Sequence, residues 1–375
     1  MKKDRANRKL WILAGLLSLL WFASAASAHP LDNWHLRHSV GNGWLFDVTY
    51  GNGIFVAVGQ SYDGRCSVAT SRDGVTWTEN IFQISGALLS VTYGYNTFVA
   101  VGTDDEANGN GVILASLDAL TWTDRSFVAE GPLYDVAWGK NTFIAVGMKT
   151  IQTSPDGIHW TVRNRDAVAI TVTYGNNVFV AGNDAFYTST DGIQWLTHLS
   201  HYGVDDVQHG NDMFVALGWD GLMSVILTSI DGINWASKIV GLSHDLLAIA
   251  YGHNTFVIVG VRSILTSSDG INWIDRSVDL GQLEGVTYGE NTFVTVSNSG
   301  QIFQSDTLND SPPDRPPADD PDEDDGRTKI FVSGSCFISG MGDAALSVLA
   351  SLLLTFVGLI LLVSCILKTD PKKLK

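Results

Sequence analysis

The chain has 375 residues, 45% of them hydrophobic, and a formal net charge of −16. Its length and apolar content allow a large buried core, whereas its acidity excludes nucleic acid as a partner, because phosphate contacts need clustered Lys and Arg. The three cysteines, Cys66, Cys336 and Cys365, show neither the spacing of a disulfide framework nor a metal-ligand pattern with histidine.

Residues 1–28 have the order of a secretory signal peptide. A basic segment, Lys2–Lys9, precedes an apolar run, Leu10–Phe22, and Ala26-Ser27-Ala28 precedes His29. We expect cleavage there and export of the remaining chain. The alternative is an uncleaved anchor, for which the apolar run is short.

From Asn33 to Asp306 the chain is a repeat. A Gly that usually follows Tyr recurs seven times, at spacings of 35 to 45 residues, at Gly51, Gly94, Gly139, Gly175, Gly210, Gly252 and Gly289. A second landmark, Ser-x-Asp-Gly-x-x-Trp, places a Trp in six of the units, at Trp77, Trp122, Trp160, Trp195, Trp235 and Trp273. A period of this length is typical of propellers or arrays.

The unit Leu247–Val278 predicts four strands. Its segment Asn254–Gly260 is an unbroken apolar run, as expected for a strand that is covered on both faces. Turn pairs such as His253-Asn254 follow the repeat Gly, and the Asp-Gly of the second landmark, as in Asp269-Gly270, supplies another turn. Seven such units predict an all-β fold, a seven-bladed β-propeller over residues 29–306.

The ends of the repeat predict how the propeller closes. The seventh unit lacks its fourth strand and its Trp, whereas Asn33–Val40 matches Asn272–Val278 in its Asn-Trp and Arg spacing. We therefore expect the N-terminal strand to complete the last blade, which would hide two sheet edges.

The repeat resembles the BNR or Asp-box repeats of sialidase-type propellers and those of photosystem II assembly-factor propellers. The likeness covers Asn33–Asp306, but Ser71–Trp77 is one residue shorter between Asp and Trp than the usual Asp box. A sialidase would bring several arginines to one carboxylate, with acidic and Tyr catalytic groups. Four arginines instead follow the repeat Trp at equivalent outer-strand places, Arg37, Arg125, Arg163 and Arg276. No catalytic residue is predicted, and the repeated Asp is interpreted as a turn cap.

A ligand is expected on the face that carries the loops between second and third strands, which vary most. Gly59–Ser67, Gly102–Gly111 and Gly218–Ser224 are longer than Gly147–Lys149. Exposed aromatics beside carboxylates suit a protein or glycan ligand. No cofactor is predicted, and Ca²⁺ is the alternative that three consecutive acids would suit. The alternative is ordinary polar loops. The candidate residues are Tyr62, Asp63, Asp104, Asp105, Glu106, Trp219 and Asp220.

A second candidate is a column of first-strand residues near the axis. Asp47, Asp135 and Asp206 occupy equivalent positions there and would hold a cation or water at the mouth of the channel. The alternative is that they cap the entry of their strands.

The C-terminal part changes character. Residues 307–329 form an acidic, Pro-rich segment that predicts an extended tether. Residues 344–367 contain no charge and are long enough for a transmembrane helix, and the basic tail 368–375 predicts a cytoplasmic end, with the propeller outside.

Residues 330–343 contain a short motif, Gly334–Ile338, ahead of the apolar segment. Motif, apolar segment and basic end resemble the C-terminal sorting signals of exported bacterial proteins, such as the JDVT-CTERM type. That resemblance implies cleavage by a membrane-embedded sorting protease and surface attachment, with Cys336 as a possible lipid site. The alternative is a permanent membrane anchor.

Together these features favour an exported, envelope- or surface-anchored binding module that is not an enzyme. Two alternatives stay open: a glycan-acting hydrolase or lyase with its acids in the Asp47 column, and an assembly factor for a membrane complex.

Overall fold

The structure is a computed structural model that describes residues 29–41, 43–104, 109–126, 131–240 and 246–308. The predicted signal peptide, Asp105, Glu106, Cys336, the predicted transmembrane segment and the basic tail lie outside these ranges, as does the predicted linker beyond Leu308. Within them, no helix is long and apolar enough to cross a membrane.

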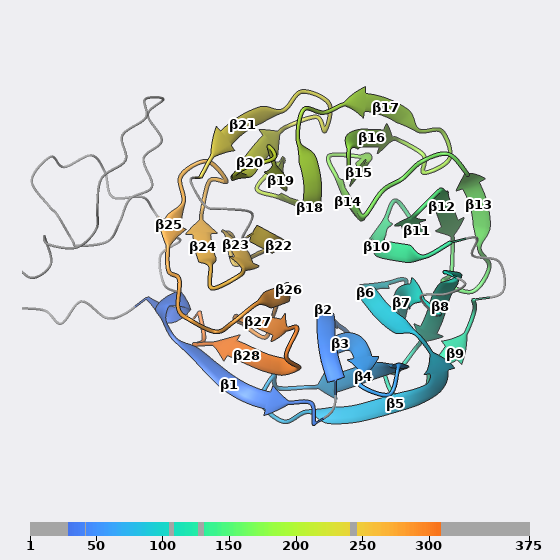
Figure 1. The fold of residues 1–375 in the computed structure, drawn as a ribbon, viewed down its shortest axis with the longest axis vertical. Helices are drawn as coiled ribbons and strands as arrows, with labels where there is room; N and C mark the ends of the chain where they lie inside the picture. Colours follow the sequence, from blue (N-terminus) through green and yellow to red (C-terminus); the bar gives the residue numbers. More distant parts are fainter. Residues whose placement is uncertain (1–28, 42, 105–108, 127–130, 241–245, 309–375) are drawn as a thin grey trace, which may run out of the picture. The chain divides into compact units, whose positions relative to one another are not determined.

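Seven four-stranded antiparallel sheets are arranged around a central axis, with the first strand of each sheet innermost (Figure 1). Blade one contains β2 (Gly43–Gly51), β3 (Ile54–Ser61), β4 (Arg65–Ser71) and β5 (Thr78–Ser85). Blade two contains β6 (Ala87–Gly94), β7 (Thr97–Thr103), β8 (Gly111–Ser116) and β9 (Thr123–Asp124). Blade three contains β10 (Leu133–Gly139), β11 (Thr142–Gly147), β12 (Thr150–Ser154) and β13 (Thr161–Asn164). Blade four contains β14 (Thr171–Gly175), β15 (Val178–Gly182), β16 (Ala185–Ser189) and β17 (Leu196–Leu199). Blade five contains β18 (Gly203–Gly210), β19 (Met213–Trp219), β20 (Ser224–Ser229) and β21 (Ala236–Ile239). Blade six contains β22 (Leu246–Gly252), β23 (Thr255–Gly260), β24 (Ile264–Ser267) and β25 (Ile274–Asp275).

Blade seven confirms the predicted closure. It contains β26 (Leu283–Gly289), β27 (Thr292–Ser297) and β28 (Gln301–Ser305), and its outer strand is the N-terminal β1 (Trp34–Ser39). In this antiparallel pair Trp34 lies opposite Ser305 and Ser39 lies opposite Gln301. A 3-10 helix, η1 (Pro30–Asp32), precedes β1 and buries Leu31 completely.

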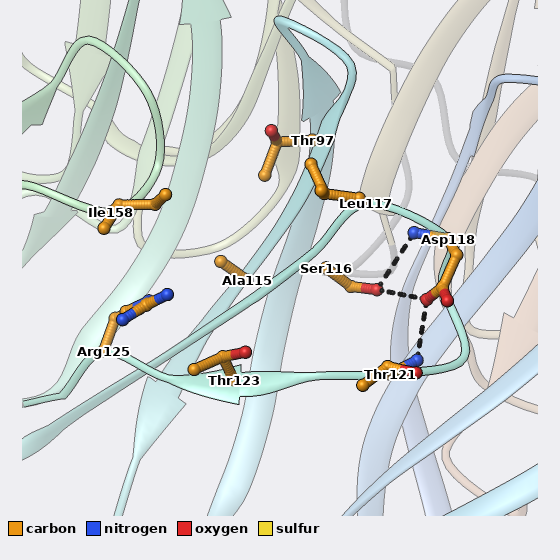
Figure 2. Close-up of a pocket in the computed structure, with 9 residues that line it drawn as sticks. All are labelled: Thr97, Ala115, Ser116, Leu117, Asp118, Thr121, Thr123, Arg125 and Ile158. Carbon is orange, nitrogen blue, oxygen red and sulfur yellow. Dashed lines mark hydrogen bonds between the residues drawn. The ribbon is translucent and has the colours of Figure 1, made fainter.

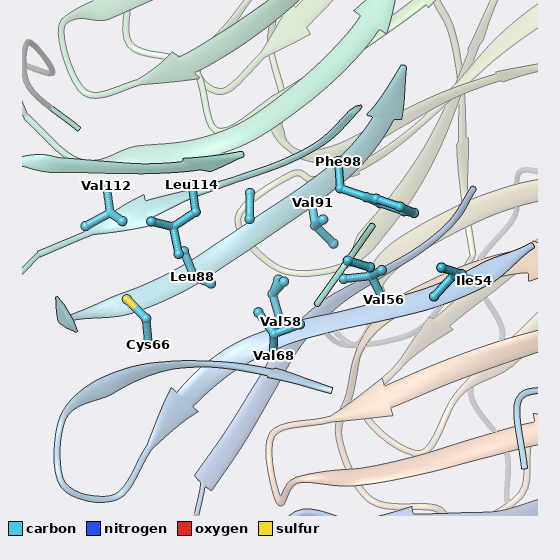
Figure 3. Packing of buried hydrophobic residues seen from close by; sticks show 12 residues of the cluster. Ile54, Val56, Val58, Cys66, Val68, Leu88, Val91, Phe98, Val112 and Leu114 are labelled. Atoms are coloured by element: carbon cyan, nitrogen blue, oxygen red, sulfur yellow. The ribbon is translucent and has the colours of Figure 1, made fainter. Parts of the chain in front are cut away.

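The core lies between neighbouring blades and repeats an aromatic triplet. A fully buried Phe on each second strand, such as Phe55, lies 4.6 Å from the Tyr50 ring and 6.3 Å from the Trp77 ring, between ring centroids. Figure 3 shows the packing between blades one and two, where Val56 and Val58 meet Leu88 and Val91. Burying one such Phe contributes about 1.5–3 kcal/mol, so seven equivalent interfaces stabilise the ring.

The repeat Gly is required by this packing. A Cβ built on Gly51 would lie 2.1 Å from the ring of Tyr93, which belongs to the next blade. The following turn pairs have positive φ at both residues, as at His253 (48°) and Asn254 (55°), which matches the predicted hairpin turns.

The interpretation of the repeated Asp as a turn cap is confirmed. In blade one the Oδ1 atom of Asp73 accepts the backbone N–H groups of Val75 and Thr76, both at 2.8 Å. These donors lower the pKa of Asp73 to about 2. The same bonds occur at Asp118, Asp156, Asp191, Asp231 and Asp269.

Cys66 is a core residue of β4. Its side chain is completely buried among Val68, Leu88 and Val112. Burial raises the pKa of the Cys66 thiol to about 12, so the nucleophilic thiolate is suppressed.

Candidate functional site

The variable loops lie at the ends of the blades opposite to the turns that contain the repeated Asp, such as Asp73, because each blade alternates strand direction. We call these turns the Asp turns. The loops that join β3 to β4, β7 to β8 and β19 to β20 all emerge on this side, which we call the long-loop face. The candidates that the structure describes are therefore on one face, but they belong to blades one, two and five. Blades one and five lie on opposite sides of the ring (Figure 1). The structure does not bring Tyr62 and Trp219 together.

Blade one carries an exposed aromatic pair. Tyr62 is 57% exposed and Trp44 is 38% exposed, and their rings meet edge to face with centroids 4.9 Å apart. Trp44 was not predicted from the sequence as a ligand-face residue. Its place in the first strand, three residues before Asp47 and so near the same face, could have indicated it. A partly exposed Tyr or Trp offers a ligand both apolar ring surface and a polar hydrogen-bonding group, and both residues are common in binding sites.

The neighbouring charges in blade one fix the loop beneath this pair. Asp63 accepts a hydrogen bond from Arg65 Nε at 2.9 Å and one from Ser61 Oγ at 2.5 Å. These donors lower the pKa of Asp63 to about 2. The loop therefore presents an ionised Asp63 and a neighbouring guanidinium at the edge of the aromatic pair.

Blade five carries a second apolar patch. Trp219 is 39% exposed, Leu222 is 79% exposed and Met223 is 40% exposed. Asp220 accepts the backbone N–H groups of Leu222 and Met223 at 2.8 and 2.7 Å, so it shapes the turn that displays these side chains. The hydrogen bonds with Met223 and Leu222 lower the pKa of Asp220.

Asp104 of blade two closes its own loop. It accepts the backbone N–H of Asn110 at 2.9 Å and the Asn110 side-chain amide at 3.0 Å. Asp105 and Glu106 are not described. No group of three or more metal-ligating side chains occurs among the described residues, and the Ca²⁺ alternative stays untested.

Asp47, Asp135 and Asp206 bind neighbouring blades together. Six of the seven first strands have a register shift at this level, for example between Leu45 and Asp47, whereas β14 of blade four begins at Thr171 without one. The carboxylate of Asp47 accepts its neighbour's N–H, from Val48, at 2.7 Å, and reaches the next blade to accept the N–H of Val91 at 2.8 Å.

The other two aspartates repeat this bridge. Asp135 accepts from Val136 at 2.7 Å and from Val172 of the next blade at 2.6 Å. Asp206 accepts from Val207 at 2.7 Å and from Ile249 of the next blade at 2.9 Å. Hydroxyl groups of the intervening blades complete the column: Ser90 donates to Asp135 at 2.6 Å, and Thr171 donates to Asp206 at 3.0 Å. The aspartates lie within the innermost strands, where they cap backbone groups.

The three carboxyl groups influence each other's protonation. Each side chain keeps a partly exposed surface, but the protein surrounds it closely. Burial raises the pKa of Asp47 to about 8 and that of Asp206 to about 7, and the charge of Asp135 adds to both shifts. Burial also raises the pKa of Asp135. Their existing hydrogen bonds favour a role in joining blades over one in catalysis.

Comparisons with known proteins identify the architecture. No protein-family model matches the sequence, and no curated protein matches it. A catalytically inactive virginiamycin B lyase from Staphylococcus aureus, with quinupristin, has a TM-score of 0.62 at 12% identity over 73% of this chain and 99% of that chain. The WD40 domain of Neurospora crassa Pan2 has a TM-score of 0.55 at 8% identity over 74% and 96%, and that of Doa1 has 0.54 at 15% over 73% and 96%.

The chain is a β-propeller repeat protein. At these identities the likeness covers the fold alone, and one propeller fold serves lyases and WD40 domains alike.

Proposed function

We propose that this propeller is a non-enzymatic binding module that holds a protein or glycan ligand on the long-loop face, at the Trp44–Tyr62 pair of blade one. The observation that carries the proposal is the 57% exposure of Tyr62, although its ring is held in place by Trp44. A ring that is already fixed loses little conformational entropy on binding, which favours it as an anchor. Asp63 and Arg65 beside it offer polar contacts of both signs.

An enzymatic role has less support. The alternative hydrolase or lyase would use Asp47, Asp135 and Asp206, and each of these already accepts two backbone N–H groups. A catalytic acid or base must be free to exchange a proton with a substrate within hydrogen-bond reach. Nothing specific favours the assembly-factor alternative over a general binding role.

Site-specific cross-linking tests the proposal. A photoreactive benzoylphenylalanine replaces Tyr62 in one variant and Ile193 in the matched control. Ile193 is 43% exposed and lies beside Asp191 in the Asp turn of blade four, on the opposite face. We expect irradiation of cells that make the full chain to give a discrete adduct from position 62 only, and Trp44→Ala to reduce its yield about tenfold or more. Equal adducts from both positions, or none from position 62, would contradict the proposed face.

We further propose that the module is exported and anchored at the cell envelope or surface. The support is the order of the predicted signal peptide, acidic tether, Cys336 motif and uncharged segment 344–367 in the sequence. We expect the intact mass of the envelope-extracted protein to lack residues 1–28 and the part after about Cys336. A mass that extends to Lys375 would instead support a permanent anchor, and a mass that retains Met1 would contradict signal cleavage.

A further inference from the structure

The groove between blades two and three, on the face that carries the Asp turns, contains an arginine without the partner that its equivalents have. In blade three Arg163 Nε donates to Thr153 at 2.8 Å, and in blade six Arg276 Nε donates to Thr266 at 2.9 Å. Arg37 Nε of blade seven likewise donates to Gln304 at 2.9 Å. In each case the acceptor is the residue before the Ser that ends the third strand from the axis.

Blade two breaks this pattern at one position. Ala115 precedes Ser116 and has no acceptor to offer, and Arg125 Nε is buried with no hydrogen-bond partner among the described residues. The guanidinium group lines a groove with a cavity volume of about 380 Å³, between the turn of blade two that contains Asp118 and Ile158 of blade three (Figure 2). A permanently charged guanidinium group without its usual side-chain acceptor is unfavourable, so the groove that it lines favours an acceptor from outside.

The interface between blades two and three, beyond the residues that line the groove, has further unmet polar atoms. Gln152 of β12 is 1% exposed, and its Nε2 has no partner among the described residues, as is also true of Thr150 Oγ1. Ile151 packs with Val172 and Phe179 of blade four, so the alternating side chains of Thr150 and Gln152 face blade two. Three of the four described side-chain atoms that are buried without a partner therefore lie at this one interface.

The groove restricts the chemistry of its ligand. Arg125 presents a planar fork that pairs best with a carboxylate. On the other side of the groove Asp118 is held ionised, because hydrogen bonds from the backbone N–H groups of Thr121 and Leu120 lower its pKa. A ligand with several carboxylates would meet repulsion there, whereas hydroxyl groups can donate to Asp118. Thr97 and Thr123 add hydroxyls, and Leu117 and Ile158 add apolar surface for the carbon face of a sugar ring.

We propose that the groove between blades two and three binds a saccharide that carries a single carboxylate, a uronic acid residue, with the guanidinium group of Arg125, which lines the groove, as the donor to the carboxylate. This site is on the face opposite to the Trp44–Tyr62 pair, and it does not depend on the function proposed for that pair.

Saturation-transfer NMR on the full-length protein in detergent tests the proposal with D-glucuronate as the probe. We expect glucuronate to bind, and D-glucose and acetate to bind about tenfold more weakly or worse, because each lacks either the carboxylate or the hydroxyls. The variant Arg125→Gln is expected to weaken glucuronate binding by about tenfold or more.

A gain-of-partner variant separates the proposal from a folding defect. Ala115→Thr supplies the acceptor that Thr153 supplies in blade three, keeps the charge of Arg125, and is expected to weaken glucuronate binding by about threefold or more. The matched control Arg163→Gln, in which the guanidinium already has its partner, is expected to change it less than about twofold. Binding that survives both Ala115→Thr and Arg125→Gln, or glucose or acetate that binds as well as glucuronate, would overturn the proposal.

Discussion

Replacing Asp135 with alanine is expected to lower the free energy of unfolding by about 3 kcal/mol. The carboxylate accepts N–H groups from Val136 at 2.7 Å and from Val172 of the next blade at 2.6 Å, and a hydroxyl from Ser90 at 2.6 Å. Alanine leaves two backbone donors near the axis without these acceptors, at about 1–3 kcal/mol each. Because the two donors belong to different blades, the loss also weakens the joint between them.

Chemical denaturation of Asp135→Ala and of a matched surface variant measures this effect. Asp184→Ala is suitable because Asp184 is exposed in the turn between β15 and β16, and we expect a change within about 0.5 kcal/mol. Asp135→Asn keeps one acceptor oxygen and is expected to lose less than alanine does. If Asp135→Ala and Asp184→Ala were equally stable, the bridge between blades would contribute nothing.

The pH dependence of the same difference gives a second measurement. Since burial raises the pKa of Asp135, Asp47 and Asp206, the folded protein retains protons on these groups that the unfolded chain has already released above about pH 4. Their contribution to stability is therefore present below the unfolded pKa and falls as the pH rises to about 8. We expect the loss in Asp135→Ala to be larger at pH 5 than at pH 9. The opposite trend would mean that the N–H donors outweigh burial.

The blades and their closure were predictable because they depend on local signals that repeat. The turn pairs that contain Asn or Gly adopt positive φ and indicated where each hairpin turns. The likeness of Asn33–Val40 to Asn272–Val278 identified the outer strand of blade seven. The aspartates of the first-strand column were also visible. Their contacts were not, because a shift such as that between Leu45 and Asp47 decides which backbone N–H group lacks a partner, and sequence period does not report it.

The candidate sites depended on pairings in space. Tyr62 and Trp219 have similar positions in their repeats, but blades one and five are separated around the ring, so the sequence could not tell one surface from two. The unmet donor of Arg125 follows from Ala115, which is ten residues earlier and in an adjacent strand position. Comparing the residue before the Ser of each Ser-x-Asp element could have found it once the arginines had been placed on the outer strands.

Replacing Asp32 with alanine is expected to destabilise the closed ring by about 3 kcal/mol. The Oδ1 atom of Asp32 lies 2.5 Å from Arg276 Nη1, and the Arg276 side chain is 2% exposed. This pair joins the N-terminal segment to blade six across 244 residues of sequence, beside Leu31, which is completely buried. Alanine would remove this carboxylate from a buried guanidinium, which is the costly way to break an ion pair.

The surface pair of Arg262 and Asp279 is the matched control. Its atoms are 3.3 Å apart and its side chains are 72% and 73% exposed, so Asp279→Ala should cost no more than about 0–1 kcal/mol. The double variant Asp32→Ala with Arg276→Met is expected to recover part of the loss, because it removes the buried charge together with its ion-pair partner. The measurement is the free energy of unfolding in urea for the unsubstituted protein, Asp32→Ala, Asp279→Ala and the double variant. Equal losses for Asp32→Ala and Asp279→Ala would show that strand pairing between β1 and β28, rather than the ion pair, holds the ring closed.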